Sequence, residues 1–347
     1  MQVTAALLGL SALSLAVPPT AALPVTPIRV GSTCTVAKRA ASCGQPSVTA
    51  SATYGGTNSS MNGTEVRLRI SNGGAGQSGL VGALAQAYID YSVENGLADE
   101  PYLIDWVTGD TTYSIDYLQS GDADIGITYN AQAEYRALNL SIASKRIYGF
   151  RDHFLIAGPK NNTANLTDSD GALDIFNKLV TTGDSGNGTL FLSRFDKSAT
   201  NIKESNLFTT IGQVPWALTY SKWYFQYPQF PIQALSAASL LQAYTLSDRG
   251  TLLTLQSQEP TLVDNLVIYK RGEDDDPEDL LLNPAAVLLG SNICPDNQAL
   301  AEGFMDWMAS ADGGQAVVSS YTQPGSTEIL YTAAPNCTTQ PDHCLGW

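Results

Sequence analysis

Histidine and basic residues are scarce in this chain of 347 residues. It has two histidines, and its 18 Lys and Arg against 33 Asp and Glu give a formal charge of −15. Two histidines cannot supply a typical catalytic zinc site. Nucleic acid and acidic membrane surfaces are excluded as partners, because no basic face can be assembled against their phosphates. An anionic ligand must be held by local donors, since the long-range field of the protein repels it.

Long apolar runs are also missing. The run Ala5–Leu15 is too short to span a bilayer, and small residues follow it. We therefore expect residues 1–22 to be a secretory signal peptide. No other stretch is apolar enough to cross a membrane, and the C-terminus lacks the apolar tail of a lipid-anchor signal. The sequence thus predicts a secreted, extracellular protein that does not insert into a membrane.

Cysteines and glycosylation sequons agree with export. Cys34 and Cys43 form one close pair near the N-terminus, and Cys337 and Cys344 form another near the C-terminus. This pattern is typical of disulfides in an oxidising compartment, with one of the five cysteines left over and the connectivity open. Asn-x-Ser/Thr sequons, which predict a glycoprotein of the eukaryotic secretory route, occur at Asn58, Asn62, Asn139, Asn161, Asn165, Asn187 and Asn336.

Segments with strand and helix patterns alternate along most of the chain. Residues 23–64 are rich in Ser, Thr, Ala, Gly and Pro and predict an irregular, glycosylated arm. Order begins with the alternating strand Val66–Ile70, followed by a glycine-rich loop and the apolar-periodic helix Leu80–Asn95. The same alternation continues to a last helix at Gly313–Tyr321. It predicts an α/β fold with parallel sheets covered by helices on both faces.

The first candidate site is the loop Ser71–Gly79. A glycine-rich turn that feeds a helix N-terminus presents backbone N–H groups to an anion. The expected donors are Ser71, Asn72, Gly73, Gly74 and Ser78. The loop also fits Gly-x-Gly-x-x-Gly, but the next strand does not end in the acidic residue of a dinucleotide site, and a simple tight turn is the other alternative.

The second candidate site is the segment Ser193–Thr200, between a strand and a helix that begins near Asn201. Arg194 can donate two parallel hydrogen bonds to an oxyanion. Ser198 and Thr200 can cap the helix. By itself the segment is more typical of an ordinary capped helix with a surface arginine.

Three other patterns are weaker. Gly183–Gly186 resembles the nucleophile motif of trypsin-like proteases, yet neither histidine is suitably placed to act with Ser185. The acidic run Glu273–Asp279 lacks the glycine and spacing of an EF-hand, so a solvated loop is expected. An aromatic cluster between Trp216 and Tyr227 indicates core packing rather than a carbohydrate platform.

Six motifs, in order, resemble those of the tungstate-binding proteins of bacterial ABC importers, within the type II periplasmic binding protein superfamily. Ala243–Thr251 reads Ala-Tyr-Thr-Leu-Ser-Asp-Arg-Gly-Thr, nearly identical to the family segment. The other matching segments are Ser78–Leu80, Gly121–Asp124, His153–Lys160, Ser193–Glu204, and Asn283-Pro284 with Phe304–Trp307. The sequons and the absence of a lipidation cysteine predict a secreted eukaryotic, fungal member of this family.

The resemblance implies a two-lobed type II periplasmic-binding-protein fold, with a two-crossover hinge and a mostly parallel sheet flanked by helices in each lobe. We expect residues 65–155 and 260–330 to form lobe 1, residues 156–259 to form lobe 2, and residues 331–347 to form a tail. The resemblance implies that the first-strand loop and Arg194 with its neighbours contact the ligand from opposite lobes. Tyr129 and Asn130, which stand where the family has His-Asp, complete the expected ligand contacts.

These observations predict a solute-binding protein that captures a small tetrahedral oxyanion between two lobes. Tungstate or molybdate is favoured, and phosphate or sulfate is possible. We expect a monomer without cofactor, metal or catalytic residues; a transporter partner is unknown. The alternatives are an extracellular interaction protein on a binding fold that has lost its ligand, or a hydrolase acting through Ser78 or Ser185.

Overall fold

The computed structural model describes residues 38–39, 44–58, 60, 63–217, 221–273, 276–337, 339–340 and 344. The expected signal peptide, residues 1–22, lies outside these residues. Residues 37–347 form one compact unit, and it is the subject of the following description. Within the described residues, no helix combines the length and apolar character needed to cross a membrane.

The first sheet has the strand order β2-β4-β3-β5-β11-β6. The strand β3 forms where the sequence predicted a strand, with Leu68 and Ile70 fully buried, but Arg69 between them is only 2% exposed, so the two faces do not alternate in burial. β3 runs parallel to β1, β4 and β5. β2 pairs antiparallel with β4, and β11 pairs antiparallel with both β5 and β6. β12 also pairs antiparallel with β6. The strands are β1 (Lys38–Arg39), β2 (Ala52–Tyr54), β3 (Glu65–Asn72), β4 (Leu103–Thr108), β5 (Ile125–Thr128), β6 (Ala143–Pro159), β11 (Leu282–Gly290) and β12 (Thr332–Ala333).

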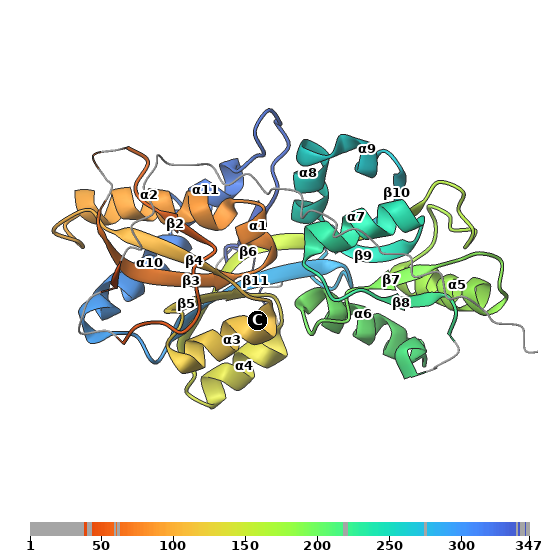
Figure 1. The fold of residues 1–347 in the computed structure, drawn as a ribbon, viewed down its shortest axis with the longest axis horizontal. Helices are drawn as coiled ribbons and strands as arrows, with labels where there is room; N and C mark the ends of the chain where they lie inside the picture. The colour runs from red at the N-terminus through yellow and green to blue at the C-terminus, as the bar shows by residue number, and fades with distance from the viewer. Residues whose placement is uncertain are drawn as a thin grey trace, which may run out of the picture. The chain divides into compact units, whose positions relative to one another are not determined.

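Helices cover both faces of this sheet (Figure 1). The larger core contains Leu84 and Tyr88 of α2 and Phe304 of α10, and the Tyr88 and Phe304 rings meet edge to face at 5.1 Å. A smaller core around Leu118 and Ala137 lies under α3 and α4. The helices are α1 (Gly74–Gln77), α2 (Leu80–Glu94), α3 (Thr111–Ser120), α4 (Ala131–Asn139), η3 (Pro295–Asn297), α10 (Gln298–Ala309) and α11 (Gly314–Ser320).

The second sheet continues through β6 in the order β6-β9-β7-β8, with β10 also paired to β6. Its main core is aromatic: the rings of Phe176, Phe191 and Phe208 are 4.6 to 5.8 Å apart. The elements are α5 (Ala172–Asp184), β7 (Phe191–Ser193), α6 (Ala199–Thr210), η2 (Pro215–Ala217), β8 (Tyr224–Gln226), α7 (Pro231–Leu241), β9 (Tyr244–Asp248), α8 (Arg249–Gln258), α9 (Pro260–Val263) and β10 (Leu266–Arg271). Separate cores around the two sheets confirm the predicted two-lobed α/β fold.

Strand β6 belongs to both sheets. Its first part pairs with β11, and residues Phe154–Ala157 pair with β9 (Figure 1). The sequence predicted a strand only at His153–Ala157. The preceding residues, Ser144 to Asp152, include several charged side chains and lack a clear apolar alternation, so the pairing partner β11 rather than local pattern determines their conformation.

Two further expectations need correction. The segment 23–64, expected to be irregular, contains β2, in which Thr53 pairs with Asp105 of β4. The loop Ser71–Gly79 contains the single-turn helix α1, followed by Gly79 at a positive φ of 92°. A side chain at Gly79 would also meet the Tyr321 hydroxyl, which explains the glycine there.

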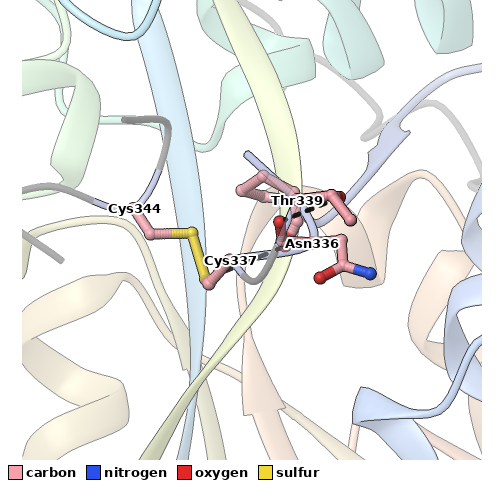
Figure 2. The surroundings of a disulfide bond; sticks show 5 residues. Asn336, Cys337, Thr339 and Cys344 are labelled. Atoms are coloured by element: carbon pink, nitrogen blue, oxygen red, sulfur yellow. Dashed lines mark hydrogen bonds between the residues drawn. A yellow bond between two sulfur atoms is a disulfide. The ribbon is translucent and has the colours of Figure 1, made fainter. Parts of the chain in front are cut away.

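A disulfide joins Cys337 to Cys344, a pairing that the sequence had left open (Figure 2). Cys294 is also disulfide-bonded, so it is not the unpaired cysteine. The expected pair Cys34 and Cys43 lies outside the described residues. The sequon residue Asn336 is exposed beside the disulfide, and the other described sequon asparagines, Asn58, Asn139, Asn161, Asn165 and Asn187, are exposed too. Glycosylation stays a prediction.

Candidate functional site

A cavity of about 40 Å³ opens where the two sheets meet. Since a single water needs about 10–15 Å³ on the same measure, the space suits a small polyatomic ion rather than a sugar or nucleotide. The cavity lies at the carboxyl ends of the parallel strands of both sheets, where ligands of open α/β sheets bind. Its lining residues are Asn72, Gly73, Gly74, Asp110, Thr111, Ile127, Tyr129, Asp152, Arg194, Ser198, Ala199, Thr200, Phe230, Pro231, Asp248 and Asn283.

Asn72 fixes the shape of the first loop. Its Oδ1 accepts a hydrogen bond from the Gly76 N–H at 2.9 Å, and its Nδ2 donates to the Ile127 carbonyl at 2.8 Å. The amide is therefore occupied within the protein and ties β3 to β5. Gly73 and Gly74 leave bare backbone at the cavity. A Cβ on Gly73 would lie 3.2 Å from the Gly109 carbonyl oxygen, a close approach that favours glycine.

Arg194 follows β7 and reaches the cavity from the second lobe. Its Nε donates to the Gln229 carbonyl at 3.0 Å and its Nη2 donates to Asp196 at 2.6 Å. A longer contact of 3.4 Å joins Nη1 to the Thr200 hydroxyl. A guanidinium has five N–H donors, so contacts within the described chain leave two of them for a ligand. The interactions with Gln229 and Asp196 hold the group in place.

Two helices begin at the cavity. Ser198 caps α6, since its Oγ accepts a hydrogen bond from the Asn201 N–H at 3.2 Å, as the sequence predicted. The helix begins at Ala199 rather than near Asn201, so Thr200 lies in its first turn and does not cap it. The N–H groups of Ala199 and Thr200, at the first two positions of α6, have no acceptor within that helix. They line the cavity together with the positive end of the helix dipole.

Helix α3 begins at the same cavity in the first lobe. Asp110 caps it by accepting from the Tyr113 N–H at 2.9 Å. Thr111 follows and is 4% exposed. Its Oγ1 is buried without a hydrogen-bond partner in the described structure, as is Oδ1 of Asn283. Buried polar atoms are rarely left without a partner, so these two atoms mark the cavity wall as a place for a polar ligand.

Three carboxyl groups also line the cavity, those of Asp110, Asp152 and Asp248. Burial raises the pKa of Asp152 well above its usual value, and the charge of Asp248 raises it further. Burial also raises the pKa of Asp248 and of Asp110. Two unit charges 5 Å apart interact by about 3 kcal/mol at an effective dielectric of 20. Fully ionised carboxylates would therefore oppose the entry of a dianion.

Seven of the predicted site residues line this cavity, namely Asn72, Gly73, Gly74, Tyr129, Arg194, Ser198 and Thr200. Three others do not. The Ser71 hydroxyl is 2.9 Å from the Ser114 hydroxyl, and the Ser78 hydroxyl is 2.8 Å from the Tyr331 hydroxyl. Asn130 caps α4 and lines a neighbouring cavity of about 260 Å³. Ligand contact by any of these residues stays a prediction.

Sequence reasoning missed Thr111, Asp152, Asp248 and Asn283. One signal was available for Thr111: the run Thr108-Gly109-Asp110-Thr111 ends a strand and caps a helix, in the same way as the two candidate loops. Asp152 and Asp248 come together only through the pairing of β6 with β9, and no local pattern shows this.

The arrangement can hold an anion, and among the described residues neither of the two serines considered as nucleophiles has a base beside it. The Ser78 hydroxyl donates to the Ala75 carbonyl at 3.0 Å and contacts a tyrosine rather than a histidine or carboxylate. Ser185 is the exposed C-cap of α5, and its hydroxyl donates to the Thr182 carbonyl. The cavity instead collects N–H and O–H donors from both lobes.

Comparison with known proteins agrees with this architecture. Residues 47–312 match the model of the PBP superfamily domain. The chain is 30% identical over 218 residues to a Haloferax volcanii protein provisionally named an ABC transporter anion-binding protein, covering 62% of this chain and 59% of that protein. It is 26% identical over 174 residues to the tungstate-binding protein TupA of Campylobacter jejuni, covering 49% of this chain and 59% of that protein.

A solved structure gives a broader match. A periplasmic protein provisionally described as metal-binding is 45% identical to this chain with a TM-score of 0.72, covering 82% of this chain and 99% of that protein. The family model covers well over half of the chain, and the solved structure shares both its sequence and its fold. The chain therefore belongs to the PBP superfamily domain family.

Proposed function

We propose that this chain is a secreted solute-binding protein that captures a small tetrahedral oxyanion in the cavity between its lobes. Tungstate and molybdate are the first candidates, and phosphate and sulfate follow. We further propose that it acts as a monomer, needs no cofactor and has no catalytic role. The names of its relatives, which include anion-binding and tungstate-binding proteins, support the ligand class.

One observation carries this proposal: Arg194 and the first N–H groups of α6 line the same small cavity as the backbone of Gly73 and Gly74. Donors from both lobes thus surround a space too small for most organic ligands. Oxyanions bind well to fixed N–H groups and to a guanidinium, because neither must reorganise on binding. A cradle of this kind acts at short range, so a protein of charge −15 can still hold an anion.

The test is a thermal-shift panel of tungstate, molybdate, phosphate and sulfate, followed by calorimetry. A ligand at a hundred times its Kd stabilises the protein by about 2.7 kcal/mol. We expect such a shift with at least one of these anions. We also expect that Arg194→Ala abolishes binding, since it removes two free donors and a positive charge.

Arg136→Ala is the matched control. It removes the same charge from an exposed position on α4 outside the cavity, so the affinity should stay unchanged. Wild-type-like affinity in Arg194→Ala would refute the site. The absence of any heat or shift with all four anions would refute the ligand class and favour an extracellular interaction protein.

A further inference from the structure

Two buried carboxyl groups stand side by side in the wall of the oxyanion cavity. Asp152 lies on β6 and is 3% exposed, and Asp248 ends β9 and is 7% exposed. β6 and β9 pair antiparallel next to them, both residues line the same cavity, and a hydrogen bond from Asp152 lowers the pKa of Asp248. Two carboxyls this close and this buried cannot both be ionised at low cost, so they share a proton.

The contacts indicate which carboxyl holds the proton. Asp248 caps α8: its Oδ1 accepts from the Thr251 N–H at 2.7 Å and its Oδ2 accepts from the Thr251 hydroxyl at 2.7 Å. Both oxygens are thus used as acceptors, which suits a carboxylate. Asp152 accepts from the His153 N–H at 2.8 Å through Oδ1. The Gly250 N–H is also hydrogen-bonded to this carboxyl. A protonated carboxyl keeps acceptor lone pairs, so Asp152 can accept from both N–H groups and donate its O–H to Asp248.

The charged and titratable surroundings do not change this assignment. Arg194 lowers the pKa of Asp248, and the Arg249 guanidinium, at the start of α8, lowers that of Asp152; burial and the charge of Asp248 outrank the Arg249 contribution at Asp152. The Tyr129 and Tyr331 hydroxyls face the pair, and burial keeps the pKa of both tyrosines well above the usual value, so they remain neutral. The His153 side chain lines a different cavity.

We propose that Asp152 is a neutral hydrogen-bond donor to the captured oxyanion, and that in the empty site its O–H donates to the Asp248 carboxylate instead. When the anion enters, the Asp152 O–H breaks its hydrogen bond to Asp248 and donates to an anion oxygen instead. The proton stays covalently bound to Asp152 throughout. Asp248 keeps its hydrogen bonds to Thr251. This inference rests on the proposed function and adds a specificity-determining residue to the same site.

A cation bound between the carboxylates is the competing explanation of the acidic wall. The described residues do not gather three His, Cys, Asp or Glu side chains in the way that a metal ion requires. Both oxygens of Asp248 already accept hydrogen bonds from Thr251, so less of their capacity is left to coordinate a cation. A shared proton accounts for the pair without a metal.

The pH dependence follows from the direction of the shift. Because the pKa of Asp152 is raised, its proton is present below that pKa and is lost as the pH rises through it. Oxyanion affinity is therefore full at lower pH and declines above the pKa of Asp152, by about tenfold per pH unit for one linked proton. Tungstate or molybdate at low concentration is the suitable probe, because neither anion titrates in the neutral to alkaline range.

Asp152→Asn gives the sharpest test, since an amide can accept from the His153 N–H and donate to the anion without titrating. We expect affinity within about threefold of the wild type at neutral pH and no alkaline loss. Asp152→Leu removes the donor and should lose more than about tenfold in affinity. Burial raises the pKa of Glu204 to about 8, so its carboxyl contributes a protonated C=O band to both proteins. The infrared spectrum of the wild type minus that of Asp152→Asn at neutral pH should therefore retain one protonated-carboxyl C=O band, that of Asp152.

Asp110→Asn is the control, because it removes a carboxylate from the same cavity but leaves the pair intact. It should retain the infrared band and the pH dependence. The proposal is overturned if Asp152→Asn fails to bind the anion that the wild type binds, if the wild type minus Asp152→Asn difference spectrum shows no protonated-carboxyl band, or if binding requires a divalent cation. A wild type that binds no oxyanion at any pH would instead refute the proposed function.

Discussion

Thr111 places a hydroxyl in the cavity wall with nothing in the described structure to bond it. A buried hydroxyl without a partner costs about 1–3 kcal/mol. The position is the first of α3, where valine would fit nearly as well as threonine. The simplest reason for a hydroxyl at this place is that it donates to the ligand.

We predict that Thr111→Val leaves the free protein as stable as the wild type or stabilises it by about 1 kcal/mol, because an unsatisfied polar atom is removed. The same change should weaken oxyanion binding by about tenfold, the value of one hydrogen bond. Thermal melts without ligand and calorimetry with ligand measure the two effects. Thr210→Val, an exposed hydroxyl at the end of α6, should change neither; unaltered affinity in Thr111→Val would show that its hydroxyl does not reach the ligand.

At the scale of elements, Glu134 holds the turn from β5 to α4. Its Oε1 accepts from the Thr128 hydroxyl at 2.8 Å and from the Asn130 N–H at 2.9 Å, and its Oε2 accepts from Nε and Nη2 of Arg146 on β6 at 2.9 and 2.8 Å. Glu134 and Arg146 are 1% and 8% exposed in their side chains. This turn carries Tyr129 into the oxyanion cavity.

We predict that Glu134→Ala destabilises the protein by about 3–5 kcal/mol, because it leaves a buried guanidinium without its carboxylate. Urea unfolding measures this loss. The double variant Glu134→Leu with Arg146→Met should recover most of the stability, since replacing both charges avoids the unpaired one. A loss below about 1 kcal/mol in Glu134→Ala would mean that water already reaches the pair.

The sequence predicted elements better than it predicted the site. Local patterns were sufficient for β3, α2 and the capped start of α6. The spacing of apolar residues in a strand or helix, and the capping bond of Ser198, involve only residues that are close in the sequence. They were not sufficient for the full length of β6, whose conformation depends on β11, over a hundred residues later. Asp152 and Asp248 were missed for the same reason, since long-range strand pairing brings them to one wall.

At the scale of the whole molecule, the net charge of −15 opposes the proposed ligand. Each approaching anion must cross a repulsive field before it meets the short-range donors. The Debye length is about 30 Å at 0.01 M salt and about 8 Å at 0.15 M. Salt therefore removes most of the barrier to approach while leaving the buried contacts largely unchanged.

We predict that the association rate of tungstate or molybdate rises severalfold between about 0.01 and 0.15 M KCl, with little change in the dissociation rate. Trp106 is a natural reporter in stopped-flow fluorescence, since its Nε1 donates to the Asn72 carbonyl beside the cavity. An association rate that falls with salt would indicate that a local positive field around Arg194 outweighs the charge of the protein.

The position of β11 has a consequence for synthesis on the ribosome. β11 pairs with β5 on one side and with β6 on the other, yet it lies at Leu282–Gly290, after every strand of the second sheet. The outer edge of β5 therefore stays open while residues 129–281 are translated, and open strand edges attract other chains. The second lobe can complete its sheet before the first one does. A nascent chain arrested before Leu282 would thus be the form that most needs a chaperone.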